Sequence, residues 1–147
     1  GVIAAYGLWG DIRSTLMPQQ SVLADTGQIT VPRAPDGHYY LTLTINGEPV
    51  DFLVDTGASQ MVLNAEAAER GGLETGDLAF LGRAMTANGE VRTARVKLET
   101  VELGPVTDRN VAAWVNEGEL EQSLLGMGYL QRFSGFEINN NRLILTR

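Results

Sequence analysis

The tripeptide Asp-Thr-Gly occurs twice in this chain of 147 residues, at Asp25–Gly27 and at Asp55–Gly57. A carboxylate on a turn that contains glycine is one way to hold a group that activates water. The same tripeptide also forms ordinary surface turns. Asp55 lies in the apolar stretch FLVDTGAS, where a carboxylate is costly unless it is hydrogen-bonded or functional. Neither copy, one copy or both could therefore carry chemistry.

The rest of the composition excludes several other kinds of site. The chain has no cysteine and a single histidine, His38, which excludes thiol catalysis, disulfides, cysteine-ligated zinc and a two-histidine metal site. The formal net charge is −7 and no cluster of Lys and Arg occurs, so we do not expect nucleic acid as a partner. His38, beside Gly37, is typical of a turn or the start of a strand. We expect no metal and no cofactor.

The segment before Asp55 has the pattern of a β-hairpin. Apolar residues alternate from Tyr39 to Ile45, which is the period of a half-buried strand. Asn46-Gly47 follows and the apolar run resumes at Val50–Val54, and Asn-Gly between two such runs is a strong hairpin signal. Asp55 is therefore predicted at the end of a returning strand, inside the body of the domain.

The remainder of the chain reads as short strands with little helix. Asn64 can cap a short helix with the sequence AEAAER, and another helical stretch is predicted to end near Phe133. Asn88-Gly89 signals a second hairpin, whose arms carry few core residues and should project from the body. A change in alternation predicts a β-bulge near Glu99-Thr100. Together these signals predict a mainly all-β fold, a small closed barrel with one or two short helices.

Three of these segments resemble the landmarks of a known family. FLVDTGAS, the Asn88-Gly89 hairpin and SLLGMGYL are similar to the corresponding segments of retropepsin-like aspartic proteases, especially the bacterial single-domain branch. The resemblance covers the chain from His38 to Leu145. It implies a retropepsin-like acid-protease barrel and an aspartic endopeptidase that acts on polypeptides as a homodimer.

The resemblance also implies roles for individual residues. Asp55 would be the catalytic group, with one copy contributed by each subunit. The segments that support the active site would be Thr56, Gly57, Ala58 and Ser59 in the turn, and Leu124, Leu125 and Gly126 beside it. Ser59 could donate a hydrogen bond to the Asp55 carboxylate. The flap, a lid over the bound peptide, would comprise Thr86, Ala87, Asn88, Gly89 and Glu90.

Other functions stay open at this point. The same barrel could hold a peptide without cutting it, as a binding or scaffolding module. It could also bind a small ligand, with Asp55 as a structural turn. Asp25 is expected to be a surface turn, because Gln28 stands where the family has a small residue. A self-processing site or an inhibitory arm is the alternative for that segment, and Trp114 is expected in the core.

We expect two parts in the chain: an N-terminal extension over residues 1–30 and the protease domain over residues 31–147. The apolar stretch VIAAYGLW at residues 2–9 is far shorter than the roughly 20 residues that cross a bilayer. It could be an arm packed on the domain or the stump of a membrane anchor that lies upstream of residue 1. Family resemblance suggests a periplasmic domain, or one anchored in the inner membrane and facing away from the cytoplasm.

Overall fold

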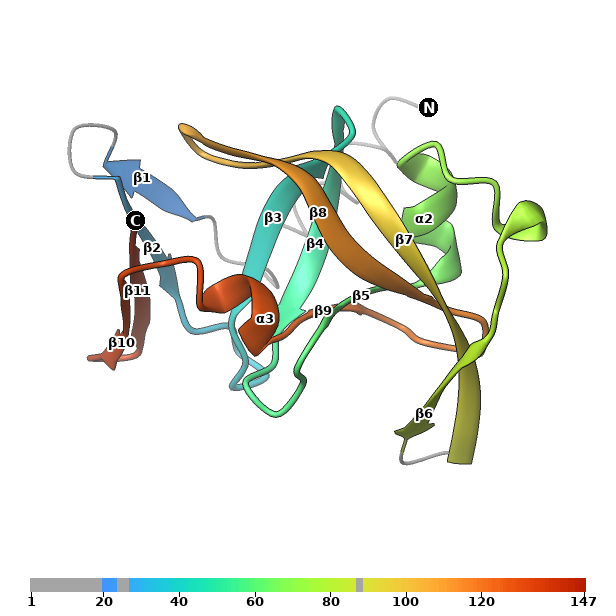
Figure 1. Ribbon diagram of the computed structural model, residues 1–147. Helices are drawn as coiled ribbons and strands as arrows, with labels where there is room; N and C mark the ends of the chain where they lie inside the picture. Colours follow the sequence, from blue (N-terminus) through green and yellow to red (C-terminus); the bar gives the residue numbers. More distant parts are fainter. Residues whose placement is uncertain (1–19, 24–26, 87–88) are drawn as a thin grey trace, which may run out of the picture.

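A computed structural model describes residues 20–23, 27–86 and 89–147 (Figure 1). These residues form mainly strands, with two short α-helices and one 3-10 turn. The N-terminal half contains β1 (Ser21–Leu23), β2 (Gln28–Pro32), β3 (Tyr40–Ile45), β4 (Glu48–Val54), β5 (Met61–Leu63), α2 (Ala65–Arg70) and the 3-10 turn η1 (Thr75–Asp77). The C-terminal half contains β6 (Gly82–Thr86), β7 (Gly89–Leu103), β8 (Val106–Asn116), β9 (Ser123–Leu125), α3 (Met127–Leu130), β10 (Gly135–Asn139) and β11 (Arg142–Thr146).

The larger of two sheets closes into a barrel. Its strand order is β3-β4-β9-β5-β8-β7-β6, and an additional pairing of β3 with β7 joins the ends of the first six strands. This confirms the predicted small, mainly β barrel. Two pairings are parallel, β4 with β9 and β5 with β8, and they join strands that are far apart in the sequence. Hairpin signals do not predict such pairings, because parallel strands have no local turn between them.

Local turn chemistry explains the hairpins. Asn46 and Gly47 have φ angles of 49° and 89°, and Asn140 and Asn141 have φ angles of 52° and 59°. Two consecutive residues with positive φ form the turn whose twist matches that of antiparallel strands, and Asn and Gly adopt it at low cost. The β3–β4 hairpin therefore forms where the sequence predicts it, and the β10–β11 hairpin uses the same turn chemistry.

The predicted cap of α2 is also present. The Asn64 side chain accepts a hydrogen bond of 2.9 Å from the amide of Ala67, which satisfies one of the free donors at the helix start. The helix ends at Arg70, after which the Gly71 amide donates to the Ala67 carbonyl at 3.0 Å. Gly72 follows with a φ of 83°, so the chain leaves the helix through a residue that tolerates this conformation.

The predicted bulge near Glu99-Thr100 is wrong. Burial in β7 does change phase between Leu98 and Val101, but the register of β7 against β8 stays constant through this point. The amides of Glu99 and Thr100 instead both donate to the side-chain oxygen of Asn46, at 2.9 and 3.2 Å. A side chain at the β3–β4 turn therefore accepts from both amides at this point, and no extra residue is inserted in β7.

The second sheet gathers the strands from both ends of the described chain. Its order is β1-β2-β11-β10, and it stands beside the barrel, opposite the projecting β6–β7 hairpin (Figure 1). Ile29, Val31, Leu143 and Leu145 are at most 1% exposed and join the barrel core. The boundary predicted between residues 30 and 31 thus falls inside β2.

An ion pair with a buried carboxylate ties the end of the chain to the barrel. Asp108 in β8 is 8% exposed, and Arg147 donates to both of its carboxylate oxygens. Arg132 approaches the same carboxylate at 3.7 Å, and the Arg147 guanidinium lies 5.2 Å from the centre of the Phe133 ring. Because both arginines contact Asp108, this carboxylate joins the segments that follow α3 and β11 to β8.

None of the helices in the described ranges has the length and apolar character that a membrane-spanning helix requires.

Candidate active site

Asp55 follows directly after β4, on a turn built by hydrogen bonds within the turn and to β9. The Asp55 amide donates to the Leu125 carbonyl at 3.0 Å, and the Ala58 amide donates back to the Asp55 carbonyl at 3.1 Å. The Gly57 amide donates to Oδ1 of the half-buried Asp55 carboxylate at 2.9 Å. A hydrogen bond from a backbone amide to a carboxylate fixes the direction of the carboxylate.

Gly57 favours this close approach, because a larger residue would require the carboxylate to shift. A Cβ built on Gly57 would lie 3.2 Å from Oδ1 of Asp55, tighter than most real Cβ contacts. Thr56 and Gly57 are both exposed, so this side of the turn is open to a ligand or to a partner chain. Ser59 is exposed too, and among the described residues its hydroxyl makes no hydrogen bond to Asp55. Support of the carboxylate by Ser59 stays a prediction.

The turn is held by the segment that follows β9. This strand lies between β4 and β5, parallel to the first and antiparallel to the second. Beyond it, the amides of Gly126, Met127 and Gly128 donate to the carbonyls of Gln60, Ala58 and Ser59 at 3.1, 2.9 and 2.9 Å. The structure therefore brings the predicted Leu124–Gly126 segment against the Asp55 turn.

Two glycines make this contact possible. A Cβ on Gly126 would lie 2.5 Å from the Gln60 carbonyl oxygen and 2.6 Å from that of Ala58, and a Cβ on Gly128 would lie 2.7 Å from that of Ser59. Both would collide with backbone, which cannot move aside as a side chain can. Gly128 was not predicted as a site residue, although it lies two residues after Gly126 and, like Gly126, must lack a side chain to pack against the turn.

A row of half-exposed side chains crosses the barrel next to the turn. Residues that are opposite each other in a ladder point to the same face of a sheet. The pairings place the following residues in one row: Leu53, Leu124, Val62, Trp114 and Arg95. Their neighbours along the strands are mostly buried, so the opposite face belongs to the core. We call this row the site row; Asp55 is two residues beyond its first member.

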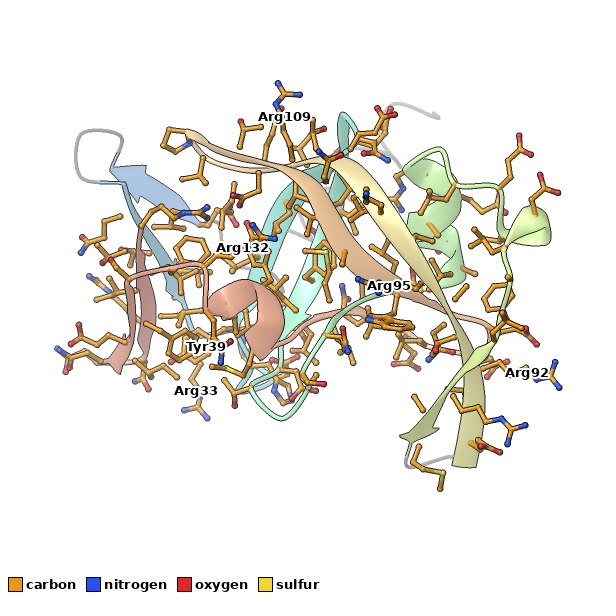
Figure 2. All side chains as sticks on the ribbon, in the orientation of Figure 1. Arg33, Tyr39, Arg92, Arg95, Arg109 and Arg132 are labelled. Atoms are coloured by element: carbon orange, nitrogen blue, oxygen red, sulfur yellow. The ribbon has the colours of Figure 1, made fainter. Side chains whose placement is uncertain are left out.

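Trp114 corrects one expectation from the sequence. It is half-buried rather than in the core, and its indole N–H donates to the side-chain oxygen of Gln60, the last residue before β5. Alternation in β8 could not reveal this, because the period of a strand shows which residues share a face but not which face is covered. Figure 2 shows Arg95, the last member of the site row, where β7 and β8 cross.

The β6–β7 hairpin, residues 82–86 and 89–93, extends from the barrel edge (Figure 1). Thr86 is opposite Gly89, and Met85 is opposite Glu90, so the predicted lid residues Thr86, Gly89 and Glu90 lie at the end of the described arms. Ala87 and Asn88 lie outside the described residues. Met85 is 79% exposed, which is unusual for a large apolar side chain.

The loop before β3 contains a charged residue, Asp36, and contacts the end of β4. The Val54 amide donates to the Tyr39 carbonyl at 2.9 Å, which joins this loop to the strand that carries Asp55. Within the loop, a hydrogen bond from the Tyr40 hydroxyl and another from the His38 amide lower the pKa of Asp36. Burial and then Asp36 raise the pKa of Tyr40 to about 12. The His38 amide donates to Asp36 at 2.9 Å, as expected of a turn residue.

Among the described residues, no group of three or more His, Cys, Asp or Glu side chains could hold a metal ion. Asp25 and Thr26 of the first Asp-Thr-Gly lie outside the described residues, as does the stretch at residues 2–9.

Comparisons with known proteins agree with this geometry. A family model described as gag-polyprotein putative aspartyl protease matches residues 41–132. Uncharacterized protein RP867 of Rickettsia prowazekii (strain Madrid E) is 38% identical over 132 residues, which cover 90% of this chain and 57% of that protein. Uncharacterized protein in cobV 5′region of Sinorhizobium sp. is 39% identical over 119 residues, which cover 80% of this chain and 51% of that protein. The chain thus spans just over half the length of these two relatives.

A solved structure shares both fold and sequence with this chain. The retropepsin-like aspartic protease from Rickettsia conorii superposes with a TM-score of 0.75 and 39% identity, over 81% of this chain and 98% of that one. The family match covers more than half of the chain, and it includes the Asp55 turn and the segment after β9. The chain therefore belongs to the retropepsin-like aspartic protease family.

Proposed function

We propose that this protein is an aspartic endopeptidase that acts as a homodimer, with Asp55 of each subunit in one shared active site. The observation that carries the proposal is the Asp55 turn. Its carboxylate is oriented by the Gly57 amide, and its backbone is fixed to the segment after β9. The bond from the amide two residues on also occurs in ordinary turns, as at Asp36, so the weight of the proposal rests on the backbone bonds to the distant segment after β9. Family membership supports the same reaction.

The chemistry follows from two carboxylates that share one proton. Like charges a few ångströms apart cannot both stay ionised, so one carboxylate is a base while the other is an acid. The base takes a proton from a water whose oxygen attacks the scissile carbonyl carbon, and the acid protonates the carbonyl oxygen. The tetrahedral intermediate then breaks its C–N bond. The leaving amine takes up the proton that the base had removed from water, and a hydroxyl of the intermediate returns a proton to the other carboxylate. One Asp55 per chain supplies half of this pair, which is why the proposal requires a dimer.

The substrate would be an extended polypeptide that lies between the site row and the β6–β7 hairpin, which would serve as the flap. Leu53, Val62, Leu124 and Trp114 offer an apolar floor, which favours apolar side chains next to the cut. The edge strand β6 has an unpaired side in the described barrel, and a peptide can add to such an edge through backbone hydrogen bonds.

The test is cleavage of a degenerate peptide library between acidic and neutral pH by the wild type, Asp55→Asn and Asp25→Asn. Asn keeps the shape of Asp and can still accept from the Gly57 amide, so Asp55→Asn should fold and lose cleavage. Asp25→Asn changes the same tripeptide at the other position and should cleave like the wild type. Sedimentation of each variant checks the dimer, whose two chains of net charge −7 should associate better as the pH falls.

Three results would count against the proposal. One is a wild type that is folded and dimeric but inert over this pH range. Another is Asp55→Asn with full activity, and the last is a monomer at every pH at which cleavage occurs. In the first case, retention of library peptides by the inert protein would favour a peptide-binding module.

A further inference from the structure

Trp114 makes a contact that neither the barrel core nor the Asp55 chemistry requires. Its indole N–H donates to the side-chain oxygen of Gln60, which is 54 residues away in the sequence. The backbone of Gln60 is itself fixed, because its carbonyl accepts from the Gly126 amide at 3.1 Å. Through its side chain, Gln60 thus links the indole to the loop that carries Asp55.

The other end of the same indole reaches the base of the β6–β7 hairpin. In the ladders, Trp114 is opposite Arg95, and Gly82 is opposite Thr93, which is two residues before Arg95. A Cβ built on Gly82 would lie 3.4 Å from Cζ3 of Trp114 and 2.5 Å from Oγ1 of Thr93. The six-membered ring therefore lies across β7 and next to the first residue of β6.

Gly82 lets β6 pack this closely. Any side chain there would have to displace Thr93 and would touch the indole, so the glycine keeps the root of the hairpin close to Trp114. Beyond this root the support becomes sparse. The ladder of β7 with β8 ends at Thr93 and Asn116, and one more backbone hydrogen bond of 2.9 Å joins Glu117 to Arg92.

We infer that Trp114 and Gln60 are positioning residues that fix the β6–β7 hairpin relative to Asp55. The inference rests on the proposed function, in which this hairpin is the lid over the peptide. The indole binds the Asp55 loop at its nitrogen and packs against the hairpin root at its far edge. A lid that is held in this way closes at a set height above the carboxylate. Trp114 and Gln60 need not touch the reacting atoms.

The test compares variants that remove the hydrogen bond from either side. Trp114→Phe keeps an aromatic ring but loses the donor, and Gln60→Leu loses the acceptor at an exposed position where folding should be unaffected. Gln60→Glu retains an acceptor oxygen and serves as the conservative variant. The matched control is Thr42→Val, which removes another exposed hydrogen bond between side chains, 2.6 Å to Asp51 in the β3–β4 hairpin.

Two measurements are made on the full chain: hydrogen exchange of the amides in residues 82–86 and 89–93, and the KM and kcat for a cleaved peptide. One neutral hydrogen bond corresponds to about fivefold in an equilibrium constant, so each single variant should speed exchange in the hairpin and raise KM by about that factor. The kcat of Gln60→Leu should stay within about twofold, because the lid contacts bound peptide both before and during the reaction. Trp114 also lies in the proposed floor under the peptide, so Trp114→Phe is judged by hydrogen exchange. The double variant should match Trp114→Phe, because Gln60→Leu removes no contact that Trp114→Phe leaves in place.

The results separate this inference from the proposed function. If the wild type cleaves no peptide, the proposed function fails, and hydrogen exchange alone still decides whether the contact holds the hairpin. The inference would be overturned if both single variants had the same hairpin exchange rates and the same KM as Thr42→Val. Effects of Trp114→Phe and Gln60→Leu that simply add would also overturn it. Recovery of wild-type exchange in Gln60→Glu supports it, because a loss of folded protein would not be rescued by a retained acceptor.

Discussion

Gly126→Ala should separate the Asp55 turn from the segment that holds it. The new Cβ would lie 2.5 Å from the Gln60 carbonyl oxygen, 2.6 Å from the Ala58 carbonyl oxygen and 2.8 Å from the Ala58 carbonyl carbon. All three distances are below 3.0 Å, which real Cβ atoms essentially never show, and all three neighbours are backbone atoms. The segment after β9 must therefore move away from the turn.

The magnitude follows from the bonds that this movement stretches. The Gln60 and Ala58 carbonyls accept from Gly126 and Met127 at 3.1 and 2.9 Å, and the Asp55 amide donates to Leu125 at 3.0 Å. At about 1 kcal/mol for each hydrogen bond, their loss destabilises the fold by about 3 kcal/mol. For a domain of this size, that lowers the melting temperature by about 6–12 °C.

The assay is thermal and urea unfolding followed by circular dichroism, with Gly76→Ala as the matched control. Gly76 lies in η1 with no atom within 4 Å of its would-be Cβ and a φ outside the left-handed region, so the control should melt close to the wild type. Gly128→Ala meets one carbonyl oxygen, at 2.7 Å, and should fall between the two. A Gly126→Ala protein that melts within about 2 °C of Gly76→Ala would refute the reasoning.

Three further predictions concern the C-terminal part of the chain. Burial, and then Asp108, raises the pKa of Tyr129 to about 12 from 10.0, so the neutral phenol stabilises the fold below pH 10 and this contribution is lost between pH 10 and 12. The free energy of unfolding, obtained from urea curves at pH values up to 11.5, should fall by an amount approaching about 2–3 kcal/mol in the wild type but not in Tyr129→Phe. An equal fall in the variant would contradict the assignment. Arg147→Ala leaves the buried Asp108 carboxylate with only the more distant Arg132. It should therefore lower the free energy of unfolding by about 3 kcal/mol, and adding Asp108→Asn should recover part of this loss. Ile138 is 56% exposed on the edge strand β10. Ile138→Lys should weaken the proposed dimer at least tenfold in sedimentation and leave the melting temperature of the monomer unchanged. Unaltered association would exclude this strand from the interface.

Several elements could be predicted from the sequence because their causes are local. Asn46-Gly47 and Asn140-Asn141 adopt positive φ angles with little cost, and the hairpins form around them. Asn64 begins a helix because its own side chain reaches an amide three residues later. In each case the atoms that decide the structure are within a few residues of one another, so the pattern of residue types contains the answer.

The expected bulge in β7 and the expected burial of Trp114 failed for the opposite reason. The bend at Glu99 is satisfied by Asn46, a side chain from another hairpin. The Trp114 indole donates a hydrogen bond to Gln60, which is near it only because β5 pairs with β8. A partner that comes from a distant part of the chain leaves no signal in the local alternation.

The sequence by itself determined the type of group at the site: the Asp-Thr-Gly that follows the apolar residues Phe52–Val54, in a chain with no cysteine, one histidine and an acidic net charge. Only the tertiary structure decided how that group is held. The insertion of β9 between β4 and β5 brings Gly126 and Gly128 against the Asp55 turn, and the site row assembles from strands that are adjacent only in the barrel. Backbone hydrogen bonds between distant segments depend on the path of the whole chain, because every residue type offers the same amide and carbonyl.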